Sequence, residues 1–68
     1  MTLKDLRTSA GKTVKETAAA LGVTRSAITN YEAGIRLPNI AQVLILAELY
    51  DCSERDVIEA ALNSQNAR

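Results

Sequence analysis

The 68-residue chain contains no histidine, tryptophan or phenylalanine and has a single cysteine, Cys52. One cysteine excludes a disulfide within the chain, and the lack of histidine excludes the usual cysteine and histidine zinc sites. Nucleophiles activated by a histidine are excluded for the same reason. We therefore expect no enzyme, no bound metal and no cofactor, and a reducing compartment such as the cytoplasm.

The sequence also lacks a long apolar run. Its first ten residues carry Lys4, Asp5 and Arg7, where a secretory signal needs apolar side chains. The most apolar stretch, residues 40–49, contains Glu48 and is too short to span a bilayer. We expect a soluble protein with no membrane partner.

Net charge is also absent, because eight basic side chains balance eight acidic ones. The two signs are nevertheless separated along the chain. Residues 1–38 contain six basic and three acidic side chains, whereas residues 39–68 contain two basic and five acidic ones. A domain polarised in this way can turn a basic surface toward a polyanion.

Apolar residues recur at helical spacing and never alternate with polar ones over the length of a strand, which predicts an all-α fold. Capping residues and glycines divide the chain into five helices. The expected helices cover about residues 3–10, 14–21, 25–33, 40–50 and 54–62, and their caps are Thr2, Thr13, Thr24, Asn39 and Ser53. The segment 63–68 is expected to fray.

The second and third helices are joined by only three residues, 22–24. Such a short joint makes the helices cross rather than lie antiparallel, and Gly22 tolerates the positive φ that it needs. Ala18 provides a small side chain where the two axes approach. Ile28 and Tyr31 form an inward stripe on the third helix, and the residues that remain outward can all form hydrogen bonds: Arg25, Ser26, Thr29 and Asn30.

The segment from Thr13 to Gly34 resembles the helix-turn-helix of the phage-repressor, Cro-like family of bacterial and phage transcription regulators. The resemblance rests on the small residue of the second helix, the turn glycine, the inward isoleucine and tyrosine, and a Glu-x-Gly-x-x-x-Pro ending, which are Ala18, Gly22, Ile28, Tyr31, Glu32, Gly34 and Pro38. It covers about residues 3–62. It implies a compact five-helix lambda-repressor-like DNA-binding fold, with residues 1–68 as one domain.

In this family the third helix lies in the DNA major groove and the second crosses the backbone. The resemblance implies base contacts from Arg25, Ser26 and Asn30, with Thr29 and the hydroxyl of Thr24 close by. Arginine suits guanine O6 and N7, asparagine suits adenine N6 and N7, and a hydroxyl suits either base. Without the surrounding motif, the same residues would simply be the polar side of a solvated helix.

Phosphate contacts are expected beside this helix, where they fix its register. They lie at two places: Lys12, Thr13, Val14 and Lys15 around the start of the second helix, and Arg36 and Asn39 before the fourth. The hydroxyl of Thr13 and the free N–H groups behind it suit a phosphate. Val14 cannot form the bridge made by the glutamine that many family members have in its place. Ordinary solvation is the alternative for the three cations.

Three further positions, Arg7, Thr17 and Glu32, concern the packing of the helices. Arg7 and Glu32 match an ion pair of the family that links the first helix to the end of the third. We expect this pair to be structural, because breaking one side of a buried pair is costly, and a phosphate contact by Arg7 is the alternative. Thr17 replaces a large aliphatic residue. Either its methyl group packs while its hydroxyl bonds the helix backbone, or the core is underfilled there.

The fourth helix has apolar residues on more than one stripe, so it is either the central core element or shares its surplus face with another subunit. A small domain gains from additional burial, and we expect a homodimer joined through the fifth helix and part of the fourth. The expected interface residues are Leu46, Leu49, Val57, Ile58, Ala61 and Leu62. Twofold symmetry predicts recognition helices about 34–36 Å apart and a near-palindromic operator.

The leading hypothesis is a sequence-specific DNA-binding regulator of the small Cro repressor type, located with the nucleoid in the cytoplasm of a bacterial or phage-infected cell. No effector-sensing domain fits in this length, so no small-molecule effector is expected. Activation through contact with a polymerase stays open. The alternative is a protein-interaction module, such as an antitoxin-like partner binder, with weak or no DNA binding. Its support is the neutral charge and the pI near 6.1.

Overall fold

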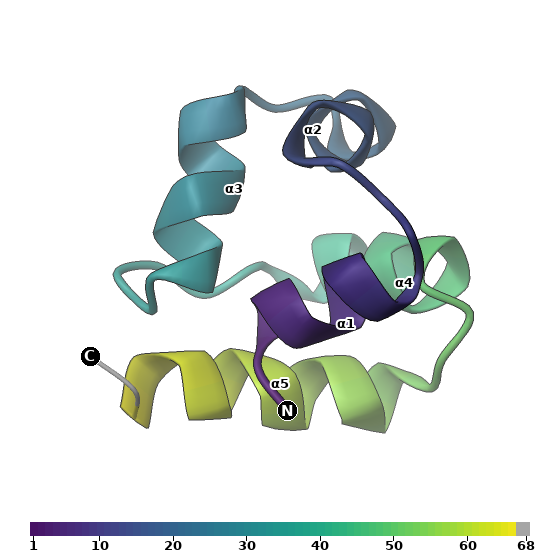
Figure 1. Ribbon diagram of the computed structural model, residues 1–68. Coiled ribbons are helices and arrows are strands. Elements are labelled where there is room, and N and C mark those ends of the chain that lie inside the picture. The colour runs from purple at the N-terminus through teal and green to yellow at the C-terminus, as the bar shows by residue number, and fades with distance from the viewer. Residues whose placement is uncertain (67–68) are drawn as a thin grey trace.

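The computed structural model describes residues 1–66, which form five α-helices and no strand (Figure 1). The helices are α1 (Leu3–Ser9), α2 (Val14–Leu21), α3 (Arg25–Glu32), α4 (Ile40–Leu49) and α5 (Glu54–Asn66). The predicted all-α fold is confirmed, and the helix ends agree with the expected ones to within one residue everywhere except at the end of α5.

Each helix begins at a side chain that accepts a hydrogen bond from its first turn. These caps are the predicted Thr2, Thr13, Thr24, Asn39 and Ser53. At four of them, all except Thr24, the side chain three residues later accepts a bond from the N–H of the cap in return. Because each bond spans only three residues, the sequence was sufficient to locate the start of every helix.

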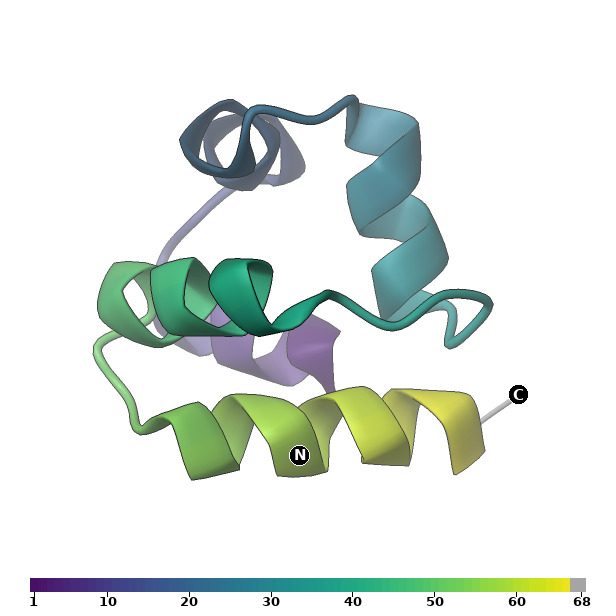
Figure 2. The same ribbon diagram turned by 180° about the vertical axis from the view of Figure 1, so that it is seen from behind.

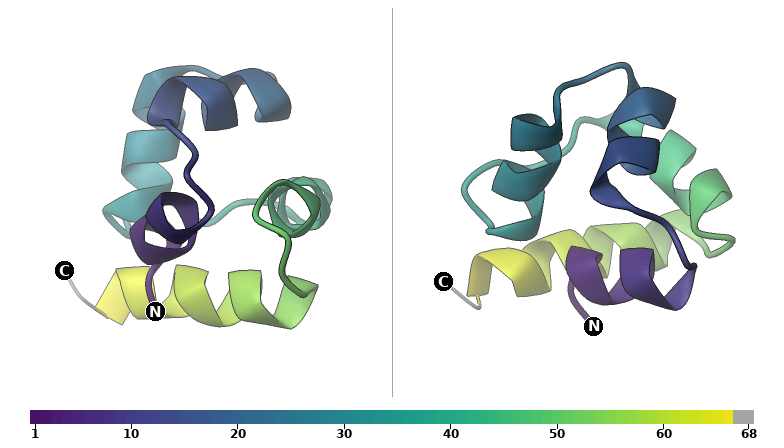
Figure 3. Two further views of the ribbon diagram at one scale, coloured as in Figure 1. Left: turned by 45° about the vertical axis from the view of Figure 1, so that its right-hand side comes forward. Right: turned by 45° about the horizontal axis from the view of Figure 1, so that its top comes forward.

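Helix α2 lies at one end of the molecule and α5 at the other, with α1 and α4 between them, and α3 runs along one side from α2 toward the end of α5 (Figure 1, Figure 3). Every helix contributes to one core, made by Leu3, Ala18, Ile28, Tyr31, Val43, Leu46, Ala47, Tyr50, Val57, Ala60 and Ala61. Within the described residues, no helix is both long and apolar enough to cross a membrane.

Helix α4 packs against both α2 and α5 and buries Val43, Leu46 and Ala47 in the core, while Ile40, Leu44 and Ile45 on its other side are exposed. Leu46 and Val57 are buried in the core and were wrongly included in the expected dimer interface. Ala61 is also buried, but it lines an open groove together with Ile58 and Leu62. Of the other expected interface residues, Leu49 is half-buried, whereas Ile58 and Leu62 are both 48% exposed. The error arose because α4 and α5 each carry apolar residues on two sides, and helical spacing does not reveal which side faces inward.

Helix α5 is longer than predicted, because it continues to Asn66 instead of ending near Leu62 and fraying. The buried hydroxyl of Ser64 accepts a bond from the Leu3 N–H at 3.1 Å and donates to the Ala60 carbonyl at 2.9 Å. The bond from Leu3 satisfies one of the free N–H groups at the start of α1. The additional turn of α5, residues 63–66, is therefore bonded to the N-terminal segment. Residues 67 and 68, part of the segment expected to fray, lie outside the described residues.

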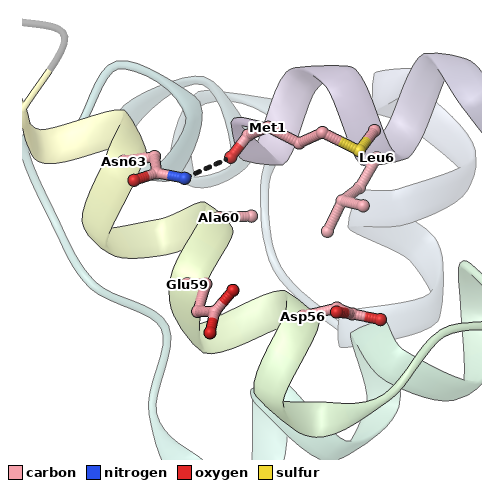
Figure 4. A pocket seen from close by; sticks show the side chains of 6 residues that line it. All are labelled: Met1, Leu6, Asp56, Glu59, Ala60 and Asn63. Atoms are coloured by element: carbon pink, nitrogen blue, oxygen red, sulfur yellow. Dashed lines mark hydrogen bonds between the residues drawn. The ribbon is translucent and has the colours of Figure 1, made fainter.

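The first residues of the chain close against the same helix. The Asn63 side chain donates to the Met1 carbonyl at 2.9 Å, and the Met1 side chain extends toward Leu6 (Figure 4). Together with Asp56 and Glu59 of α5 they line a small pocket between α1 and α5. The start of α1 is thus fastened to α5 at two successive residues, Asn63 and Ser64.

Gly34 brings the turn after α3 against the end of α5. Its φ of 76° lies in the left-handed region, which favours glycine. Its surroundings add a second requirement, because a Cβ atom here would overlap the Ser64 carbonyl oxygen and lie 2.6 Å from the Gln65 Cα. Figure 2 shows this turn beside the last turns of α5. Only glycine allows the two segments to approach this closely.

Replacing Gly34 with alanine is expected to lower the free energy of unfolding by well over 2 kcal/mol, because left-handed strain of about 1–2 kcal/mol is joined by overlap with a backbone. Gly11→Ala is the matched control, since Gly11 has φ 71° and open space around its Cβ position. The Gly11→Ala variant should lose only the unfolding free energy that left-handed strain costs, about 1–2 kcal/mol. Urea unfolding followed by circular dichroism measures both, and equal losses would contradict the packing role of Gly34.

Candidate nucleic-acid interface

The joint between α2 and α3 has the predicted construction. Gly22 ends α2 in the left-handed region with φ 68° and ψ 32°, and the N–H of Val23 donates to the Ala18 carbonyl at 3.0 Å. Ala18 is buried, and Val23 packs against the core. The chain therefore turns within three residues, and α3 leaves α2 at a steep angle (Figure 3).

Helix α3 has one buried and one open side, as its spacing predicted. Ile28 and Tyr31 are buried, whereas Arg25, Ser26 and Thr29 are exposed. Asn30 is partly exposed. Within residues 1–66, the guanidinium of Arg25 and the carboxamide of Asn30 form no hydrogen bond, so both remain available to a ligand.

The two threonines of this segment use their hydroxyls differently. Thr24 accepts a bond from the Ala27 N–H at 3.2 Å, so the proton of its own hydroxyl remains free for another acceptor. Thr29 donates its proton to the Arg25 carbonyl at 3.1 Å. A donating role toward DNA therefore remains for Thr24 but not for Thr29.

The start of α2 offers fewer free N–H groups than expected. Glu16 accepts a bond from the Thr13 N–H, and Thr13 accepts one from the Glu16 N–H, both at 3.0 Å. These bonds with Thr13 hold the pKa of Glu16 below its ordinary value. The N–H groups of Val14 and Lys15 remain for an anion, so Val14 can contribute through its backbone while its side chain packs against the core.

The cations expected near phosphates are all at least partly open to solvent. Lys15 and Arg36 are exposed, and Lys12 is partly buried. The N–H groups of Ile35 and Arg36 both donate to the Asn30 carbonyl, at 3.0 and 3.4 Å. This bond pair folds the loop back onto α3, which places the backbone of Arg36 next to the turn that carries Asn30.

Asn39 begins α4 at the other end of that loop. Its side-chain oxygen accepts a bond from the Gln42 N–H at 2.8 Å, which leaves its amide group to donate elsewhere. The Gln42 side chain in turn accepts bonds from the Asn39 N–H at 2.9 Å and from the Tyr31 hydroxyl at 3.1 Å. Sequence reasoning missed this link between the core of α3 and the cap of α4. A polar residue three places after a cap signals the capping bond, but nothing in the sequence pairs it with Tyr31.

The predicted ion pair between Arg7 and Glu32 is present. The Arg7 Nε lies 2.6 Å from Glu32 Oε2, and both side chains are only 12% exposed. Arg7 also donates from Nη2 to Glu32 Oε1 at 3.3 Å and from Nη1 to the Lys12 carbonyl at 3.0 Å. The bond with Glu32 raises the pKa of Arg7 above its ordinary value. All three guanidinium nitrogens thus donate within the protein, which is the bonding expected of a structural pair.

Thr17 follows the first of its two expected alternatives. It is fully buried, and its hydroxyl donates to the Thr13 carbonyl at 3.0 Å. The same oxygen accepts a bond from the Tyr50 hydroxyl at 3.4 Å, a contact that the sequence did not reveal. Burial raises the pKa of Tyr50 above its ordinary value, so the phenol stays protonated at neutral pH.

The separation of charge along the chain becomes a separation in space. Around α2 and α3 the exposed or partly exposed cations are Lys12, Lys15, Arg25 and Arg36, accompanied by Glu16, because Glu32 is paired with Arg7. On α4, α5 and the turn between them the exposed charged side chains are mostly acidic: Glu48, Asp51, Glu54, Asp56 and Glu59, with Arg55. The basic end carries the open side of α3.

A double-mutant cycle on Arg7→Met and Glu32→Gln tests the ion pair. Each single change is expected to cost about 3 kcal/mol of unfolding free energy because it leaves a buried partner unpaired, and the double variant should lose less than the sum. The control pair is Arg55 and Glu59, which are 87% and 59% exposed and 3.1 Å apart. Its coupling should not exceed about 0.5 kcal/mol. Equal coupling in the two pairs would refute the role of burial.

A family model described as helix-turn-helix matches residues 3–57, from the first helix into the fifth. No curated protein and no solved structure gives a significant match to the chain. The matched range contains the crossing pair α2 and α3, the turn glycine and the whole basic end of the molecule. The chain therefore belongs to the Cro/C1-type helix-turn-helix family of DNA-binding transcription regulators.

Proposed function

We propose that this regulator binds a near-palindromic operator sequence-specifically as a homodimer, in the manner of a small Cro-type repressor acting at the nucleoid. The observation that carries the proposal is the open side of α3, which presents an unpaired guanidinium and an unpaired carboxamide from a helix whose opposite side is buried. Side chains held on a rigid element can be positioned against base edges with little loss of conformational freedom.

The base contacts are assigned by the chemistry of each group. Arg25 suits the O6 and N7 atoms of a guanine, and Asn30 suits the N6 and N7 atoms of an adenine, each adding about 1–3 kcal/mol of discrimination. The hydroxyls of Ser26 and Thr24 keep a proton for a base or phosphate oxygen. One half-site therefore includes at least one G·C and one A·T pair.

Phosphate contacts on both sides of α3 would fix its register. On one side they come from the Val14 and Lys15 N–H groups, the Thr13 hydroxyl proton and the Lys12 and Lys15 ammonium groups; on the other they come from Arg36 and the Asn39 amide. About six such contacts per dimer would make the affinity fall steeply with rising salt. Glu16, the acidic cap of α2, opposes this attraction in part.

The dimer would form through an apolar surface that the described residues leave open. A groove between the α3–α4 loop and α5 is lined by Leu37, Pro38, Val43, Ile58, Ala61 and Leu62. Near it, Leu44 is exposed, and Ile40 is 82% exposed. A second copy packed here would cover both residues of the original expectation that remain exposed, Ile58 and Leu62. It would also place the two loops that carry Arg36 beside the twofold axis.

The second candidate is a protein-interaction module on the same fold. The specific observation in its favour is that α5 carries both residues of this open apolar groove and the exposed carboxylates Glu54, Asp56 and Glu59, a combination that suits a basic amphipathic partner such as a toxin or a polymerase segment. A regulator can use both surfaces, so this binding would add to DNA recognition. No small-molecule effector is needed in either case.

Arg25 and Lys15 are predicted to act on DNA binding in different ways. The operator is first recovered by selecting bound fragments from random DNA and sequencing them. Arg25→Ala should then relax the preference at one base pair per half-site, with a loss of about 1–3 kcal/mol at that pair. Lys15→Ala should weaken all sequences alike and reduce the salt slope by about one per subunit. Arg55→Ala, at an exposed position of α5, is the control and should change neither the base preference nor the salt slope. If Arg25→Ala weakens binding to every sequence equally, the proposed base contact of Arg25 is contradicted.

The apolar groove is predicted to hold the dimer together. Ile58→Asp should raise the dimer dissociation constant at least tenfold, because it places a carboxylate in an apolar interface. Sedimentation equilibrium without DNA measures this constant. Ala20→Asp, on the exposed side of α2, is the matched control. A protein that is monomeric at all concentrations, or a dimer unchanged by Ile58→Asp, would contradict the interface.

A further inference from the structure

Thr29 differs in chemistry from the other residues on the open side of α3. It is exposed, it follows Arg25 by four residues and Ser26 by three, and it therefore lies next to both on the helix surface. Its hydroxyl donates to the Arg25 carbonyl at 3.1 Å. The only proton that this side chain could offer to DNA is thus used within the helix.

This hydrogen bond changes what Thr29 can recognise. A phosphate oxygen accepts hydrogen bonds, as do guanine O6 and N7, so none of them gains a partner in Thr29. The oxygen keeps a lone pair that an adenine or cytosine amino group could use, and the γ-methyl group adds an apolar contact on a helix face whose other outward side chains, Arg25, Ser26 and Asn30, are all polar. In the major groove, the matching apolar group is the C5-methyl of thymine.

We propose that Thr29 reads a pyrimidine C5-methyl group, that of a thymine, in each half-site of the operator. The proposal rests on the proposed function and makes it more specific. Thr29 becomes a specificity-determining residue that acts by methyl contact, beside the hydrogen bonds from Arg25 and Asn30. The contact does not involve the hydrogen-bonding groups of the base. Thr29 should therefore also contact 5-methylcytosine, which carries the same C5-methyl group as thymine.

Replacing single thymines of the selected operator by deoxyuridine tests the contact, because this change removes the C5-methyl and keeps every hydrogen-bonding group of the base pair. We expect one thymine in each half-site at which this replacement lowers the affinity about fourfold, the effect of one buried methyl group. Replacing that T·A pair by C·G should cost more, and 5-methylcytosine in place of the cytosine should recover about fourfold. These two arms separate the methyl group from the rest of the base.

Variants of Thr29 connect the effect to this side chain. Thr29→Ser keeps the hydroxyl bond and removes the methyl group, so it should bind the thymine and deoxyuridine operators equally. Thr29→Val keeps a methyl group and should still distinguish them. Thr8 is the matched control, because its exposed side chain on α1 makes the same kind of bond, to the Lys4 carbonyl at 3.0 Å. Thr8→Ser should behave like the unchanged protein, and circular dichroism verifies that all three variants are folded.

The outcomes separate this inference from the proposed function. Specific binding in which no single deoxyuridine weakens affinity overturns the inference alone, as does a Thr29→Ser variant that still prefers thymine. A protein that binds no duplex at low salt overturns the proposed function and this inference with it. A fourfold effect that is lost in Thr29→Ser and kept in Thr29→Val supports both.

Discussion

The ion pair between Arg7 and Glu32 is the interaction on which the arrangement of α1, α2 and α3 depends. It joins the end of α1 to the end of α3, and the third bond of Arg7 holds the Lys12 carbonyl just before α2 begins. Both side chains are only 12% exposed, so water has little access to replace these hydrogen bonds if the helices shift. Breaking them would leave a buried charge unpaired, which is costly. The N-terminus of α2 and the open side of α3 are consequently held at one spacing.

Helix α5 supplies the support beneath this arrangement. Its last turns receive the N–H of Leu3 through Ser64 and lie against the turn at Gly34, where no Cβ atom fits. The same turn leads into the loop that carries Arg36 and bonds back to Asn30. Packing at the end of the molecule opposite α2 thus determines where the cation beside α3 is placed. The outer side of α5 keeps the apolar residues that the core does not use.

A neutral chain that belongs to a DNA-binding family is explained by the placement of its charges. The internal pairing of Glu32 leaves a net excess of cations around α2 and α3, and the carboxylates of α5 lie at the other end. The field of such a molecule orients it before contact, since the basic end is drawn to the phosphates and the acidic end is repelled. Net charge alone therefore understates the affinity that the basic end can have for DNA.

The sequence by itself determined the five helices, their caps, the glycine joint and the polar side of α3. Each depends on hydrogen bonds or spacings within about four residues of chain, so a short window contains all the necessary information. The ion pair was also foreseen, although only because the chain resembles a family that has it.

Only the tertiary structure decided the length of α5, the partner of Thr17, the buried state of Leu46 and Val57, and the requirement for glycine at position 34. Each depends on segments far apart in sequence, such as Leu3 and Ser64, which are 61 residues apart. A local sequence pattern indicates that a side chain is apolar or can form a hydrogen bond, whereas the packing of the helices determines which residue it contacts. That is also why the sequence identified Thr29 as a site residue while the structure determined which of its groups remains free.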